Sequence, residues 1–128
     1  MNPLQWCRIL IVDDSQFFRT QMKKILSEAD IGRRYYEAKD GQEAISQYMQ
    51  NRPDLVLMDM VMPNIDGVKA TQAIKKFDQN AKIIVFSSIE NKHIVSDAIK
   101  FGATNYILKP FDSGTAVMAV SKIITNQK

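Results

Sequence analysis

The chain has 128 residues, of which 45% are hydrophobic and 24% charged, with a formal net charge of +3 at pH 7. These values are ordinary for a soluble globular protein and predict one domain spanning residues 1–128. The longest apolar runs are too short to cross a bilayer and the basic doublets are scattered, so we expect neither membrane insertion nor direct nucleic-acid binding. The single cysteine, Cys7, cannot form an internal disulfide, which fits a reducing cytoplasm, and we interpret it as a small buried hydrophobe.

In the first half of the chain, short apolar runs alternate with longer segments of helical period. Residues 8–12 predict a strand that stops at Asp13 and Asp14, and apolar residues then recur at helical spacing over 18–29. A second strand is expected at 35–38, and a helix with an apolar face at 44–49 is closed by Pro53. Residues 55–58 predict a third strand that runs into Asp59.

The second half repeats this order, with a helix over 68–77, a strand at 82–86, a helix over 94–99 closed by Gly102, a strand at 105–108 and a last helix over 115–125. Five strands alternating with five helices predict an α/β fold whose parallel sheet is covered on both faces. Right-handed crossovers favour a doubly wound, flavodoxin-like sheet with strand order 2-1-3-4-5.

Polar side chains stand where the predicted strands end. Asp13 and Asp14 follow the first strand, Asp59 the third, Ser87 the fourth and Lys109 the fifth. The carboxyl ends of parallel strands share one edge, so these groups should converge there. Carboxylates gathered together repel one another unless a cation offsets their charge, and oxygen ligands without His or Cys favour Mg²⁺.

Each of these residues taken singly also has an ordinary structural role. An aspartate at a strand end is commonly a helix cap or turn residue, and a serine there can bond a nearby backbone group. His93, alone near a helix start, is interpreted as a surface or capping residue rather than a phosphohistidine or metal ligand. It is the combination at one sheet edge that favours a functional site.

The sequence resembles the receiver domains of bacterial two-component response regulators, in particular the single-domain chemotaxis type. The matching stretches are ILIVDDS at 9–15, DLVLMDM at 54–60, MP at 62–63, DG at 66–67, GA at 102–103, Tyr106, and KPF at 109–111. Together they cover the chain from about residue 8 to residue 124.

The resemblance implies that Asp59 accepts a phosphoryl group from a sensor histidine kinase or phosphotransfer protein, in a reaction that the domain itself catalyses and that requires Mg²⁺. Asp14 and Asp59 would bind the metal directly, Asp13 mainly through water, and the backbone carbonyl of Val61 would be a further ligand. Lys109 would neutralise charge on the phosphoryl oxygens, and the Lys109–Pro110 bond resembles the cis-proline turn of the family.

The resemblance also implies a switch, in which Ser87 bonds the phosphoryl group and Tyr106 turns inward into the vacated space. On sequence alone, Tyr106 is equally well explained as a half-buried strand aromatic. The output surface for a partner protein would comprise the fourth helix, the fifth strand and the fifth helix, roughly residues 92–124. The kinase, the target, and whether the chain is part of a longer regulator stay open.

Two positions depart from the chemotaxis regulators, which carry polar side chains there: Val61 and Ile89, each two residues beyond a site residue. Neither can bond an attacking water, so we predict slow self-dephosphorylation. The main alternative function, a Mg²⁺-dependent phosphohydrolase with an aspartyl nucleophile, usually needs an acid where Val61 stands. A flavin or nucleotide binder lacks a phosphate loop after the first strand, and a module that works without phosphorylation is disfavoured by the complete acidic site.

Overall fold

A computed structural model describes residues 3–62, 65–88 and 92–125. It contains a parallel sheet of five strands, in the order β2-β1-β3-β4-β5, which confirms the predicted fold class and strand order. The strands are β1 (Arg8–Val12), β2 (Arg34–Ala38), β3 (Leu55–Asp59), β4 (Ile83–Ser88) and β5 (Asn105–Lys109). The predicted strand at 82–86 continues to Ser88, because its last two residues still pair with β5.

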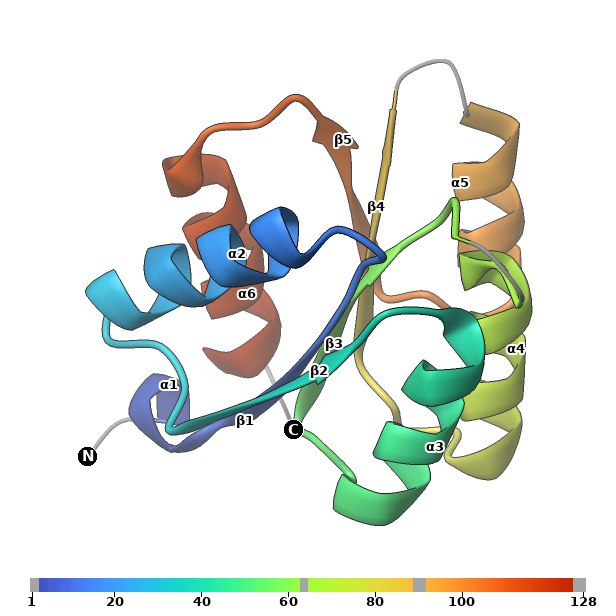
Figure 1. Ribbon diagram of the computed structural model, residues 1–128, viewed down its shortest axis with the longest axis horizontal. Helices are drawn as coiled ribbons and strands as arrows, with labels where there is room; N and C mark the ends of the chain where they lie inside the picture. Colours follow the sequence, from blue (N-terminus) through green and yellow to red (C-terminus); the bar gives the residue numbers. More distant parts are fainter. Residues whose placement is uncertain (1–2, 63–64, 89–91, 126–128) are drawn as a thin grey trace.

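The helices are α1 (Pro3–Trp6), α2 (Gln16–Glu28), α3 (Gly41–Asn51), α4 (Gly67–Phe77), α5 (Lys92–Lys100) and α6 (Ser113–Thr125). Figure 1 shows α2 and α6 on one face of the sheet and α3, α4 and α5 on the other. Each face therefore has its own core, one under α2 and α6 and one under α3, α4 and α5. Within the described residues no helix is long and apolar enough to cross a membrane.

The burial of the strands explains the near-continuous apolar runs of the sequence. All five residues of β3 are buried, as are four of the five in β1, since each strand contacts helices on both sides. The edge strand β2 is less buried and more polar. The helical segments are amphipathic, and each of α2, α3 and α4 begins with a side-chain cap at the carboxyl edge of the sheet, namely Ser15, Asp40 and Asp66.

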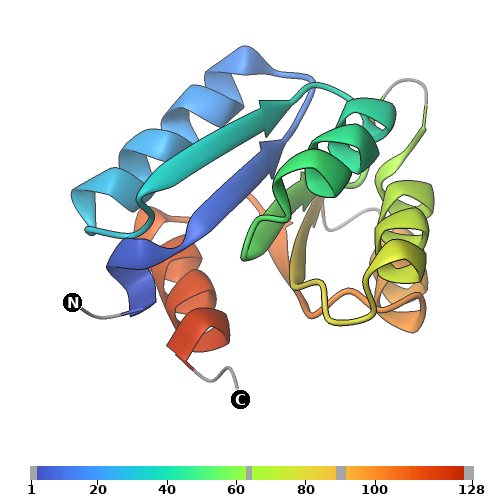
Figure 2. The same ribbon diagram turned by 90° about the horizontal axis from the view of Figure 1, so that it is seen from below.

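The four-residue helix α1 is not expected from the sequence. It lies beside α6, as the view in Figure 2 shows, and Leu4 packs against the core under α2 and α6. The Gly32 N–H donates to the carbonyl of Leu4 at 2.7 Å. Cys7 is buried, as expected, and burial raises the pKa of its thiol to about 11, so it is an inert packing residue.

Candidate functional site

The residues predicted to carry the chemistry stand at the carboxyl ends of three strands. Asp13 and Asp14 directly follow β1, Asp59 is the last residue of β3, and Lys109 is the last residue of β5. The N-cap of α2 is Ser15, so helix capping accounts for neither of the first two aspartates. The sheet order places β3 directly beside β1, which brings the acids of the two strands together.

Asp13, Asp14 and Asp59 form a compact group that we call the acid cluster. One carboxylate oxygen from each lies within 4.8 Å of the others. The ammonium of Lys109 lies 3.3 Å from Oδ1 of Asp59 and 3.6 Å from Oδ2 of Asp13. Among the described residues, Lys109 is the only cation within ion-pair distance of these two acids.

The electrostatic balance of the acid cluster is unfavourable in the absence of a further cation. Asp13 and Asp59 are only 2% and 8% exposed. Burial raises the pKa of Asp59, and the opposing attraction of Lys109 does not cancel this effect. Burial also raises the pKa of Asp13, with a further contribution from the nearby charge of Asp59. Ionising the whole cluster is therefore costly, because one lysine faces three carboxylates.

The acid cluster fits a hard divalent cation such as Mg²⁺. Oδ1 of Asp13 accepts a hydrogen bond from the Ser15 N–H at 2.8 Å, but its buried Oδ2 accepts none from the described residues. Such a buried acceptor is uncommon in folded proteins and is satisfied when an ion or a bound water contacts it. The cluster offers only oxygen ligands, and Asp14 is exposed, which leaves a path from solvent.

The remaining predicted site residues stand around this cluster. Ser87 is buried near the end of β4, and its hydroxyl lies 3.4 Å from the Ser88 carbonyl. Val61 lies two residues beyond Asp59 and is 56% exposed. His93 is exposed in the first turn of α5, as expected for a surface residue. Ile89 and Pro63, which the sequence also singled out, lie outside the described residues.

A cluster of three phenylalanine rings next to Lys109 was not predicted from the sequence. The lysine ammonium lies 4.6 Å from the ring centroid of Phe18, on α2. The rings of Phe18, Phe86 and Phe111 pack together, with centroids 5.3–6.2 Å apart. Such a ring attracts the cation and holds it beside the acids. The Lys109–Pro110 peptide bond is cis, as the resemblance implies.

Comparison with known proteins agrees with this arrangement. Residues 9–121 match the sequence profile of the response regulator receiver domain. The chain belongs to the response regulator receiver family. It is 43% identical over 122 residues to the chemotaxis protein CheY of Halobacterium salinarum, covering 92% of this chain and 97% of that one. Identity to CheY of Thermotoga maritima is 42% over 116 residues, covering 91% and 96% of the two chains.

A solved structure supports the same assignment. The crystal structure of the CheX–CheY–BeF₃–Mg²⁺ complex from Borrelia burgdorferi matches with a TM-score of 0.85 and 32% identity, covering 91% of this chain and 88% of that one. This receiver domain is thus a CheY-like module of two-component signalling.

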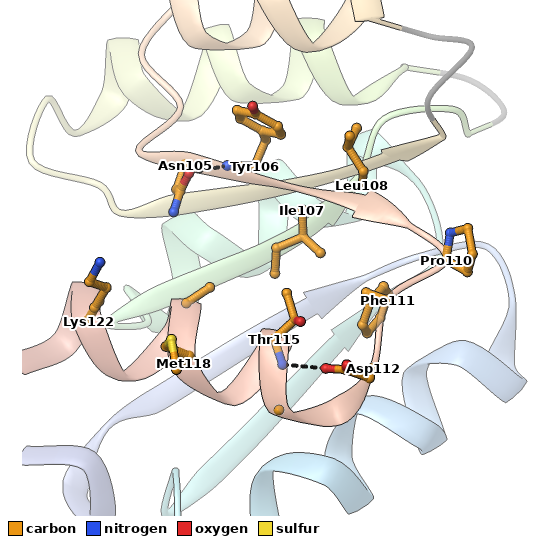
Figure 3. Close-up of a pocket in the computed structure, with 12 residues that line it drawn as sticks. Asn105, Tyr106, Ile107, Leu108, Pro110, Phe111, Asp112, Thr115, Met118 and Lys122 are labelled. Carbon is orange, nitrogen blue, oxygen red and sulfur yellow. Dashed lines mark hydrogen bonds between the residues drawn. The ribbon is translucent and has the colours of Figure 1, made fainter.

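The receiver domain carries an open groove of about 790 Å³ between β5 and α6, which we call the β5–α6 groove (Figure 3). Ile107, Phe111 and Met118 line it, and the Met118 side chain is 66% exposed. Tyr106 and Ile107 project from opposite faces of β5, and Tyr106 is 46% exposed. The ring of Tyr106 therefore points outward in this structure. The groove lies within the output surface predicted from the sequence.

Proposed function

We propose that this receiver domain is a phosphorylation-activated switch that accepts a phosphoryl group on Asp59 from a sensor histidine kinase or a phosphotransfer protein. The observation that carries the proposal is the acid cluster itself, in which the buried carboxylates at the ends of two adjacent strands contact the ammonium of Lys109. A site of this kind has affinity for a divalent cation and for a phosphoryl group that brings such a cation with it. The reaction would take place in the cytoplasm, where such a kinase presents its phosphohistidine.

The Mg²⁺ ion would be bound directly by Asp14 and Asp59, with Asp13 acting mainly through water and the Val61 carbonyl as a further ligand. Oδ2 of Asp13 contacts the Lys109 ammonium at 3.6 Å but accepts no hydrogen bond from the described residues, and this atom and the oxygen-only composition of the cluster support the assignment. When bound, the metal supplies positive charge that offsets the negative charge of the phosphoryl oxygens.

The side chains of the domain perform the transfer. A carboxylate oxygen of Asp59 forms a bond to phosphorus while the bond from phosphorus to the donor nitrogen breaks, which leaves an acyl phosphate on Asp59. The Lys109 ammonium lies 3.3 Å from that carboxylate, and its positive charge would offset the negative charge of the phosphoryl oxygens during the transfer. The domain thereby catalyses its own modification and does not turn over a substrate as an ordinary enzyme does.

Phosphorylation would then change the output surface through Ser87 and Tyr106. The hydroxyl of Ser87, buried near the end of β4, would bond the phosphoryl group, and the outward ring of Tyr106 would turn inward. The surface formed by α5, β5 and α6, including the β5–α6 groove, would bind an output protein differently in the two states. The Borrelia relative, solved as a complex with CheX, BeF₃ and Mg²⁺, supports a protein partner for such a module.

Labelling with a small phosphodonor tests the proposal. Wild-type protein incubated with acetyl phosphate and Mg²⁺ is expected to gain the mass of one phosphoryl group in an intact-mass spectrum, and Asp59→Asn is expected to gain none. Glu28→Gln, which removes an exposed acid at the end of α2, is the matched control and should be labelled like wild type. An adduct that survives in Asp59→Asn would refute the assignment, and repeated turnover of a generic phosphate ester would favour the phosphohydrolase instead.

A further inference from the structure

Gly41, the first residue of α3, packs directly against the backbone of the loop that follows β3. A Cβ atom at position 41 would overlap the carbonyl oxygen of Ile65 and would lie 2.8 Å from its carbonyl carbon. Real Cβ atoms do not approach backbone atoms this closely, and a carbonyl group cannot turn away as the end of a flexible side chain can. Only glycine therefore permits the observed distance between α3 and Ile65.

The same segment of chain also contacts the loop that follows β1. The Asp13 N–H donates a hydrogen bond to the carbonyl of Ala38 at 3.1 Å. Between Ala38 and Gly41, the buried Asp40 caps α3 by accepting a hydrogen bond from the Glu43 N–H at 2.8 Å. Residues 38–41, which we call the strut, are thus held at both ends and tied to the start of a helix.

The loop that the strut touches is also anchored to the end of β3. The Gly67 N–H donates to the carbonyl of Met60 at 3.1 Å, and a Cβ at position 67 would lie 2.8 Å from the Met60 Cα. Displacement of Ile65 would therefore act on the nearby Gly67, which contacts Met60 between Asp59 and Val61.

We propose that Gly41 is a positioning residue for the divalent cation, although its own atoms are not ligands. The strut contacts Asp13 through Ala38 and Ile65 through Gly41, so it sets the spacing between the start of the loop after β1 and Ile65. This inference rests on the proposed function, because it assigns to the strut the alignment of the proposed Mg²⁺ ligands. Residues that orient metal ligands from outside the coordination sphere control metal affinity in this way.

The test is the Mg²⁺ affinity of Gly41→Ala, measured by calorimetric titration of the metal-free protein. The added methyl group is expected to push the loop away and to weaken Mg²⁺ binding by about 10- to 100-fold, the range usual for residues that orient metal ligands. Gly114→Ala is the matched control, because a Cβ there would make only an ordinary contact of 3.5 Å with Asp112, and its Mg²⁺ affinity should equal that of wild type.

A second control separates positioning from loss of stability. Val120→Ala empties space in the core under α2 and α6, remote from the strut, and should destabilise the fold while retaining Mg²⁺ affinity. Ile65→Ala tests the same contact without adding an atom. It shortens a side chain that packs on the core under α3, α4 and α5, so Ile65 should be held less firmly and Mg²⁺ binding should also weaken.

The possible outcomes distinguish the inference from the function on which it rests. Weakened binding in a folded Gly41→Ala protein, or in Ile65→Ala if Gly41→Ala does not fold, supports the role of the strut when Val120→Ala binds normally. If a folded Gly41→Ala protein binds Mg²⁺ as wild type does, or if Ile65→Ala does so when Gly41→Ala does not fold, the role of the strut is overturned and the function stands. Wild-type protein that binds no Mg²⁺ would overturn both.

Discussion

Two regions of the sheet, the edge strand β2 and the carboxyl ends of β1 and β3, carry carboxylates in opposite electrostatic environments. Glu37, on β2, is bound by two cations, with Arg19 Nε at 3.0 Å and Lys23 Nζ at 2.8 Å, and these contacts lower its pKa, the hydrogen bond from Lys23 most of all. Among the described residues, Asp59 and Asp13 share one lysine, Lys109, and burial raises the pKa of both. Glu37 therefore contributes to stability, whereas the acid cluster costs stability until an external cation arrives.

The largest effect that tests this comparison is expected from removing the single cation of the acid cluster. Lys109→Met removes the ammonium that lies within ion-pair distance of Asp13 and Asp59, and it should slow labelling by acetyl phosphate roughly a hundredfold, because this charge no longer offsets that of the phosphoryl oxygens. Stopped labelling reactions followed by intact-mass spectra measure the rate.

Lys23→Met is the matched control on the other side of the comparison. Lys23 and Glu37 are each 35% exposed, so the loss should cost only about 0.5 kcal/mol of unfolding free energy and leave the labelling rate unchanged. Equal labelling rates in Lys109→Met and Lys23→Met would contradict the special role of Lys109.

The next largest effect is expected on the rate of acyl-phosphate hydrolysis when the exposed Val61 is replaced. Val61 offers no group that can orient an attacking water, so the acyl phosphate should hydrolyse slowly, and Val61→Asn should hydrolyse roughly tenfold faster. Decay of the phosphorylated protein after removal of the phosphodonor measures this rate. If the asparagine variant decays no faster than wild type, water positioning at residue 61 does not limit the lifetime.

The smallest effect is on the stability of the metal-free protein, measured by denaturant unfolding in the presence of a chelator. At pH 7, Asp59→Asn should increase the unfolding free energy by about 1 kcal/mol because it removes a buried, repelled charge. Glu37→Gln should decrease it by only about 0.5 kcal/mol, because solvent screens this partly exposed ion pair. If the unfolding free energy falls in both variants, the charge of Asp59 does not destabilise the metal-free fold, and the two carboxylates do not differ in the way described.

The pH dependence of these two effects should also differ. The folded-state pKa of Asp59 is raised, so the penalty from its charge disappears as the pH falls through that pKa, and the advantage of Asp59→Asn should vanish by about pH 4. The pKa of Glu37 is lowered, so its contribution is complete above about pH 4.3 and is lost only as the pH falls through the lower folded value. Unfolding curves between neutral pH and pH 4 separate the two cases.

The sequence was sufficient to predict the edge of the sheet at which the acids and Lys109 gather. Apolar runs that end in Asp13, Asp59 and Lys109 require only the rule that parallel strands end at one edge, and in the structure the Lys109 ammonium lies 3.3 Å from Asp59 and 3.6 Å from Asp13. The fold followed from the same alternation. The roles of these residues in phosphoryl transfer stay predictions.

Other features depend on contacts that no local pattern contains. Helix α1 is too short to have a recognisable period, and the packing of Gly41 on Ile65 joins residues far apart in the chain. Met49 and Ile99 belong to apolar faces in the sequence, yet they are 51% and 42% exposed, because the helices present only a narrow stripe to the sheet.

The most direct test of the account is a calorimetric titration of Mg²⁺ into wild type, Asp59→Asn and Glu37→Gln. The account predicts that wild type and Glu37→Gln bind one Mg²⁺ ion with equal affinity and that Asp59→Asn binds it much more weakly. Undiminished binding by Asp59→Asn, or no binding by wild type, would contradict the claim that the buried acids form a cation site.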